Sequence, residues 1–222
     1  MGVVALVRWL HIITGSVALA SFWVPIISKK GGQLHRRAGW VYSIAMWIAS
    51  LAAWGVCAAR LNDSDPSNDR SAIFLAFVGL LTANGAATGL RVLRRKSPAR
   101  AQAGALDWAL SVTLALSGVA LALFGVRLGD APLFLAFGLL GAVLGARQLV
   151  DWLRAPANRL TSVVAHMRNM LAACIGTVTA FLVVNAPRMG LAQAGLFVWL
   201  APGVVGGVAI ALWSRRMRGR AS

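Results

Sequence analysis

The segment KKGGQLHRR, residues 29–37, lies between two apolar runs at about 3–27 and 38–59. Each run is long enough to cross a bilayer, because a hydrocarbon core of about 30 Å takes roughly 20 apolar residues in a helix. A short basic segment between two such runs is typical of a cytoplasmic loop that joins two transmembrane helices. The segment also holds His35, one of three histidines in the chain.

The rest of the chain is as apolar as its beginning. Hydrophobic residues make up 59% of it and charged residues 13%, against about 25% charged residues in an average soluble domain. Five further apolar runs lie at about 72–93, 106–126, 131–153, 161–184 and 196–213. The sequence therefore predicts an all-α, polytopic membrane protein, a seven-transmembrane-helix bundle that forms one integral membrane domain over residues 1–222.

Basic residues are distributed unevenly between the two sides of this bundle. Of the 22 Lys and Arg, 17 fall at the first, third and fifth connections, the helix ends beside them and the C-terminal tail, and 5 fall on the other side. The positive-inside rule then places the N-terminus outside the cell and the C-terminus in the cytoplasm. The net charge of +16 indicates contact with anionic lipid headgroups and not nucleic acid.

Few polar side chains fall inside the predicted spans, and each is a candidate functional residue because burial in lipid is costly. Four of them lie within about two turns of the cytoplasmic boundary, and His35 and Arg36 lie in the loop outside it. We expect these groups to line a polar vestibule that faces the cytoplasm. His11 lies in the first helix, nearer the outer surface. The four boundary residues are Asp107, Asp151, His166 and Asn169.

A purely structural role is the alternative for several of these residues. Arg147 and Asp151 are four residues apart on one helix and would neutralise each other, and arginines near helix ends extend to the interface. Pairs of small residues predict close helix contacts in lipid. Among them are Gly141 with Gly145 and Gly203 with Gly207.

Known catalytic and metal-binding motifs are missing from the chain. It contains no HExxH, GxSxG or Walker sequence, and it contains no Glu. Cys57 and Cys174 are expected at different depths, which argues against a disulfide or a CxxC metal site. The sequence therefore predicts no metal site and leaves open whether the protein is an enzyme.

A set of short motifs resembles a family of uncharacterised predicted bacterial integral membrane proteins. The motifs are His11 with Gly15, the pair Gly31-Gly32, His35-Arg36-x-x-Gly39-x-x-Tyr42, Ala165-His166-x-x-Asn169-Met170 and Trp199-Leu200-Ala201-Pro202. The resemblance covers most of the chain and implies a multi-helix inner-membrane protein in which the three histidines matter. It implies no activity.

Three functions stay open from the sequence. The first is a small-molecule or proton-coupled transport or binding protein that uses the vestibule, with His166 as a proton carrier. The second is a haem b electron-transfer protein with His11 and His166 as axial ligands. The third is a membrane scaffold without chemistry of its own. The sequence does not indicate the number of subunits.

Overall fold

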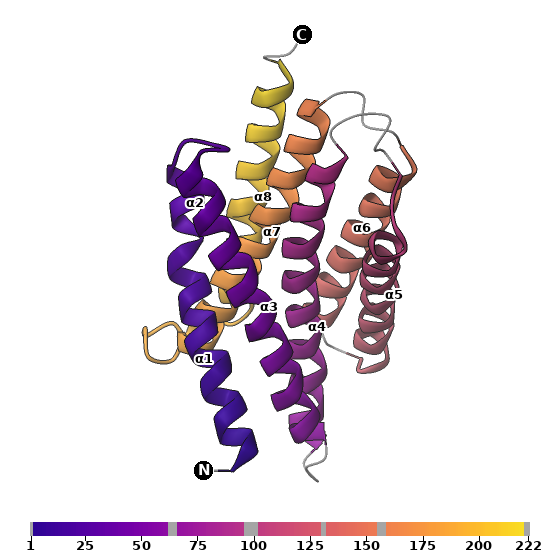
Figure 1. The fold of residues 1–222 in the computed structure, drawn as a ribbon. Coiled ribbons are helices and arrows are strands. Elements are labelled where there is room, and N and C mark those ends of the chain that lie inside the picture. Colours follow the sequence, from indigo (N-terminus) through magenta and orange to yellow (C-terminus); the bar gives the residue numbers. More distant parts are fainter. Residues whose placement is uncertain (1, 62–65, 96–101, 130–131, 155–158, 220–222) are drawn as a thin grey trace. The chain divides into compact units, whose positions relative to one another are not determined.

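The computed structural model describes residues 2–61, 66–95, 102–129, 132–154 and 159–219, and the regular structure in these ranges is helical (Figure 1). Seven segments in this part of the chain are long and apolar enough to cross a membrane. The helices are α1 (Val3–Ser21), α2 (Trp23–Ile27), α3 (Gln33–Leu61), α4 (Pro66–Arg91), η1 (Val92–Arg94), α5 (Ala105–Arg127), α6 (Pro132–Leu153), α7 (Arg159–Asn185), η3 (Ala192–Ala194) and α8 (Leu196–Gly219).

The seven long apolar helices lie where the sequence places its apolar runs, with two differences near the N-terminus. The first span consists of α1 and α2, which meet at Phe22. The second begins at Gln33, so His35 and Arg36 lie in the first turn of α3 and not in a loop. Gly31 has a φ of +74° and allows the sharp turn before α3. The residues that follow it include good helix formers such as Gln, Leu and Arg.

The chain divides into two compact units, Met1–Ala86 and Ala87–Ser222. In the first unit α1 and α2 pack along α3. Phe22 is buried where α1 meets α2, and its ring meets Tyr42 of α3 edge-on, with 6.2 Å between the centroids. Farther along α3, Trp54 donates a hydrogen bond of 2.9 Å from Nε1 to the carbonyl of Ala76 in α4. These aromatic contacts hold the helices of the first unit in register.

In the second unit α5 and α6 form a tight antiparallel pair (Figure 1). A Cβ atom at Gly118 would lie 2.7 Å from the carbonyl oxygen of Gly138, and one at Gly138 would lie 2.7 Å from the carbonyl oxygen of Gly118. Gly145 approaches Ala115 in the same way. The backbones touch because glycine has no side chain, which is how helices associate closely in lipid.

The other close pair of the second unit is α7 with α8. Gly206 of α8 packs against the side chain of Ile175 in α7, whereas a Cβ atom at Gly203 or Gly207 would meet nothing within 4 Å. The predicted contact through Gly203 and Gly207 is therefore wrong for this pair, because the helix is rotated to turn Gly206 inward.

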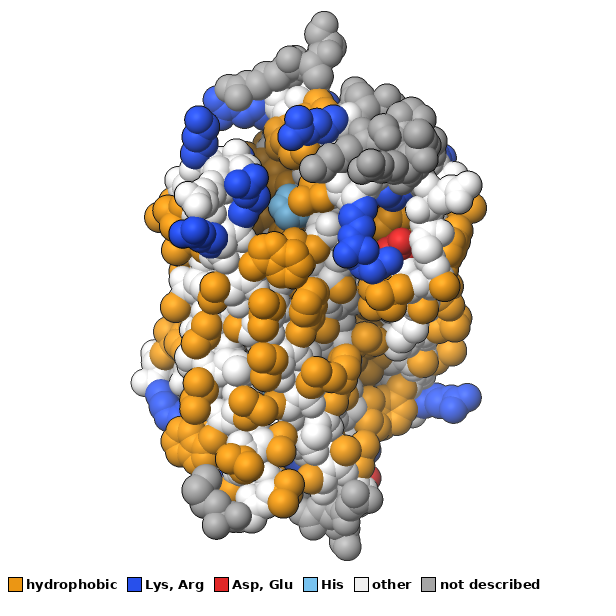
Figure 2. All heavy atoms as spheres, viewed as in Figure 1, with side chains coloured by type: hydrophobic (Ala, Val, Ile, Leu, Met, Phe, Trp, Pro, Cys, Tyr) orange, Lys and Arg blue, Asp and Glu red, His pale blue; other side chains and the backbone are white. Residues whose placement is uncertain are grey.

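Large apolar side chains are exposed along the helices of both units. On the face shown in Figure 2 they cover the length of the helices, and Lys and Arg gather towards the helix ends. An apolar exterior of this kind suits a hydrocarbon environment, since water would leave it unstable.

Candidate functional site

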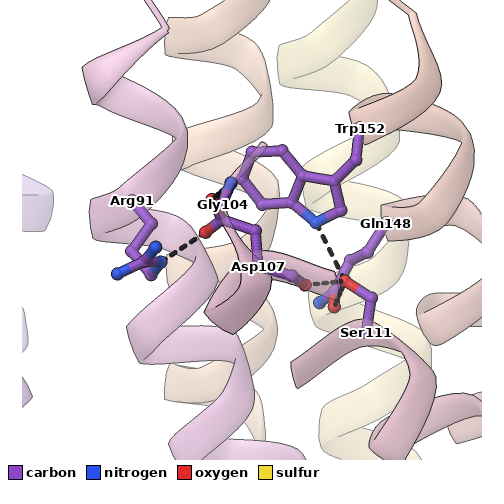
Figure 3. A network of polar contacts seen from close by, with 6 residues as sticks. All are labelled: Arg91, Gly104, Asp107, Ser111, Gln148 and Trp152. Carbon is purple, nitrogen blue, oxygen red and sulfur yellow. Dashed lines mark hydrogen bonds and ion pairs between the residues drawn. The ribbon is translucent and has the colours of Figure 1, made fainter. Parts of the chain in front are cut away.

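A buried carboxylate stands at the start of α5 in the second unit. Asp107, the third residue of the helix, accepts a hydrogen bond of 2.8 Å at Oδ2 from the backbone N–H of Gly104. Its Oδ1 forms an ion pair with Nε of Arg91 at the end of α4 (Figure 3). Because a helix N-terminus also stabilises negative charge, three groups together balance the charge of Asp107.

Ser111 lies one turn after Asp107 and joins α5 to α6. Its buried hydroxyl accepts a hydrogen bond of 2.9 Å from Nε1 of Trp152. It also lies 3.0 Å from the carbonyl oxygen of Asp107 and 3.2 Å from Oε1 of Gln148 (Figure 3). A hydroxyl carries one hydrogen, so Ser111 donates fully to one of these two oxygens at a time.

Gln148 carries the hydrogen-bond network from α6 to α7. Its Nε2 donates to Oδ1 of Asn169 over 3.0 Å, and Nδ2 of Asn169 donates to the carbonyl of Ala165 over 2.9 Å. When Ser111 donates to Gln148, a continuous chain of bonds runs from Trp152 through Ser111 and Gln148 to Asn169. We call Asp107, Ser111, Gln148, Trp152 and Asn169 the polar cluster.

The second predicted carboxylate, Asp151, pairs with a different partner from the one expected. Its Oδ2 accepts a hydrogen bond of 2.9 Å from a terminal nitrogen of Arg168 in α7. The predicted neutralisation by Arg147 within α6 is therefore corrected to an ion pair between helices. Asp151 lies near the C-terminal end of α6, and Arg168 lies in the first half of α7, the half nearer the connection between the two helices.

Arg95, which follows η1, is buried at the C-terminal end of α6. Its guanidinium donates to the backbone carbonyls of Asp151, Trp152 and Arg154 over 2.6, 3.3 and 3.1 Å. The same group lies 5.0 Å from the centroid of the Trp152 ring, a cation–π contact. Burial lowers the pKa of Arg95, while the carboxylates of Asp107 and Asp151 act in the opposite direction. Arg95 thus stabilises the unpaired carbonyls and the negative end of α6.

His166 lies on α7, one turn before Asn169. Its Nδ1 is 2.7 Å from the carbonyl oxygen of Gly89 in α4. A carbonyl only accepts hydrogen bonds, so Nδ1 carries the proton and Nε2 holds the lone pair of the neutral ring. One turn earlier, Ser162 donates to the carbonyl of Arg95 over 2.8 Å. The polar face predicted for α7 therefore bonds to α4 and to Arg95, the residue after η1.

The other two histidines belong to the first unit, and in each of them Nδ1 also donates to a backbone carbonyl. Nδ1 of His11 is 2.8 Å from the carbonyl oxygen of Ala49 in α3. Nδ1 of His35 is 3.1 Å from the carbonyl oxygen of Pro25 in α2. Lys30 also donates to the Pro25 carbonyl, over 2.9 Å. Arg36 is exposed on the first turn of α3.

The structure brings together some of the predicted residues and adds others. Asp107 and Asn169 are members of one network, whereas Asp151 pairs with Arg168 beside it. The sequence analysis did not identify Ser111, Trp152 or the hydrogen bonds from Arg95 to the end of α6. Ser111 could have been found from its spacing, because a residue four positions after Asp107 lies on the same face of the helix.

A metal site is not formed by the residues that the structure describes, since no three His, Cys, Asp or Glu side chains come together among them. The haem interpretation stays a prediction, because His11 and His166 lie in different compact units. A metal-bound or haem-bound histidine commonly donates its other ring N–H to a carbonyl, and both residues have that bond. No family model, curated protein or solved structure matches the chain.

Proposed function

We propose that the chain is a multi-pass protein of the bacterial inner membrane with its N-terminus outside and its C-terminus in the cytoplasm. The asymmetry of 17 basic residues against 5 supports this orientation. The exposed side chains of Arg36 and Arg37 would then contact anionic headgroups of the inner leaflet.

Fusions at the C-terminus test the orientation. A fluorescent protein that matures only in the cytoplasm should be bright, and alkaline phosphatase, active only after export, should be inactive. An active phosphatase fusion with a dark fluorescent fusion would overturn the proposed orientation.

For its activity we propose proton-coupled binding or transport of a small solute at the cytoplasmic end of the second unit. The observation that carries the proposal is the polar cluster, which bridges α5, α6 and α7 inside apolar helices. Asn169 lies ten residues after the start of α7, about 15 Å along its axis. Polar side chains at that depth cost free energy that apolar side chains of similar size would not, and this cost supports a functional role for the cluster.

In this proposal His166 is the residue that takes up and releases the proton. Its fixed tautomer directs the lone pair of the neutral ring to Nε2, and histidine is the side chain that changes charge most readily near neutral pH. It is also one turn from Asn169 on α7, so a change in its charge would occur beside the polar cluster.

Proteoliposomes with an internal pH-sensitive dye test the proposal with protons as the probe. Under an imposed membrane potential, the wild-type protein should move protons faster than empty liposomes, and His166→Gln should abolish the difference. Asn185→Ala is the matched control, because Asn185 lies on the same helix and its side chain donates to the carbonyl of Phe181 one turn away. If the protein causes no proton flux, or if folded His166→Gln protein shows full flux, the proposal is overturned and the interpretation as a membrane scaffold remains. An absorbance spectrum of the purified protein tests for haem in the same preparation.

A further inference from the structure

Gly89, in the last turn of α4, lies against Met170 of α7. A Cβ atom at Gly89 would lie 2.7 Å from Sδ and 2.8 Å from Cγ of Met170, and 3.3 Å from its backbone nitrogen. Real Cβ atoms essentially never come within 3.0 Å of another heavy atom in this way. The thioether therefore occupies the space that any side chain at position 89 would need, and glycine allows the two backbones to approach.

His166 makes use of the same close approach. It lies one turn before Met170 on α7, so the two side chains stand on one face of that helix. Its Nδ1 is 2.7 Å from the carbonyl oxygen of Gly89. Met170 and His166 thus contact the same residue, the first where its side chain would be and the second at its carbonyl. The hydrogen bond of His166 therefore depends on how close α7 lies to α4 at Gly89.

The other side of this turn of α4 contacts a different helix. Arg91, two residues after Gly89, forms the ion pair with Asp107 in α5. Side chains two residues apart leave a helix about 200° apart. Gly89 therefore faces α7 while Arg91 faces α5, and crowding at Gly89 acts first on the side of His166.

We propose that Gly89 and Met170 are positioning residues for His166, an inference that rests on the proposed proton-coupled function. Glycine at position 89 lets α7 approach until the imidazole reaches the carbonyl, and the thioether of Met170 fills the remaining space and holds that separation. The bond keeps the ring proton on Nδ1 and turns Nε2, the nitrogen that takes up a proton, away from the Gly89 carbonyl. A side chain at position 89 would displace Met170 and weaken the bond.

NMR of isotope-labelled histidine in the full-length protein tests this positioning without any transport assay. The protein is kept in detergent micelles at a pH where the rings are neutral, and His→Gln variants assign the three imidazole signals. Gly89→Ala should lower the ratio of the Nδ1–H to the Nε2–H tautomer of His166 about fivefold, because one net hydrogen bond contributes about that factor to an equilibrium. His11 and His35, bonded to carbonyls of the first unit, should keep their signals as internal references.

The contact with Met170 supplies a rescue and a control. Adding Met170→Ala to Gly89→Ala removes Sδ and Cγ and leaves the 3.3 Å contact with the backbone nitrogen, so most of the Nδ1–H tautomer should return. Gly206→Ala disturbs α7 elsewhere, because a Cβ atom there would press on the side chain of Ile175, and it should leave His166 unchanged. Met170→Ile, whose side chain branches at Cβ, crowds Gly89 from α7 and should lower the ratio even if Gly89→Ala does not fold.

The proton flux of the same variants in proteoliposomes separates the two proposals. Gly89→Ala should reduce the flux, and the added Met170→Ala should restore it. If the wild-type protein moves no protons while the His166 tautomer shifts as described, the positioning stands and the transport function fails. The positioning is overturned if the ratio is unchanged in folded Gly89→Ala or Met170→Ile, if the double variant shows no recovery, or if Gly206→Ala shifts it equally.

Discussion

Replacing Ser111 by Ala tests whether the polar cluster holds the second unit together. The substitution removes the acceptor of Trp152 Nε1, at 2.9 Å, and one partner of Gln148 Oε1, at 3.2 Å. A buried donor left without an acceptor costs about 1–3 kcal/mol, and a hydrogen bond between membrane helices is worth about 0.6 kcal/mol on average. We therefore expect Ser111→Ala to lower the free energy of unfolding by about 2 kcal/mol, about 30-fold in the equilibrium constant.

The assay is equilibrium unfolding in mixed micelles with a denaturing detergent, followed by circular dichroism. Ser117→Ala is the matched control, because Ser117 bonds only to carbonyls of its own helix, those of Thr113 and Leu114. Its effect should stay within about 0.5 kcal/mol. Trp152→Phe, made in the wild-type protein and in Ser111→Ala, completes a double-mutant cycle, and we expect a coupling energy of about 1 kcal/mol between the two residues. Equal effects of the two serine variants, or additive effects with Trp152→Phe, would refute the argument.

Three further predictions use other contacts. Gly138→Leu should separate α5 from α6 and lower the free energy of unfolding by at least about 3 kcal/mol in the same assay, because even a Cβ atom there would lie 2.7 Å from the carbonyl oxygen of Gly118. Gly203→Leu is the control and should be neutral, because a Cβ atom at Gly203 would meet nothing within 4 Å. Arg95→Gln should cost about 3 kcal/mol, since a buried charged donor to the α6 carbonyls is lost, and increased proteolysis after α6 would show it. Burial lowers the pKa of Lys30 below 10.5, so the unfolded chain binds more protons in the alkaline range, and stability should rise slightly as the pH approaches 10.5. Lys30→Met should remove that rise.

The spans could be predicted from the sequence because lipid imposes a simple requirement. Every backbone polar group inside the membrane must be bonded within its own helix, so a run of about 20 apolar residues is enough to locate one. The start of α3 was missed because the first turn of a helix can extend beyond the apolar run. Gln33 begins the helix five residues before the predicted boundary at 38.

The contacts between helices could not be predicted in the same way. Whether Asp151 meets Arg147 or Arg168 depends on the rotation of α6 against α7, and no pattern within one helix encodes that rotation. Arg95 is harder still, because Arg94, Arg95 and Lys96 look alike in a basic connection. The structure distinguishes Arg95 because η1 turns it towards the end of α6.

The three histidines show which part of a candidate site carries functional information. His11, His35 and His166 all donate from Nδ1 to a backbone carbonyl of another helix, so this bond alone does not set any of them apart. It fixes the ring and its tautomer, which serves helix packing as well as chemistry. What distinguishes His166 is its position on α7, since Asn169, one turn away, belongs to a network that crosses three helices. In the function that we propose, a proton taken up by His166 would act through this position on the bonded polar groups of α5, α6 and α7.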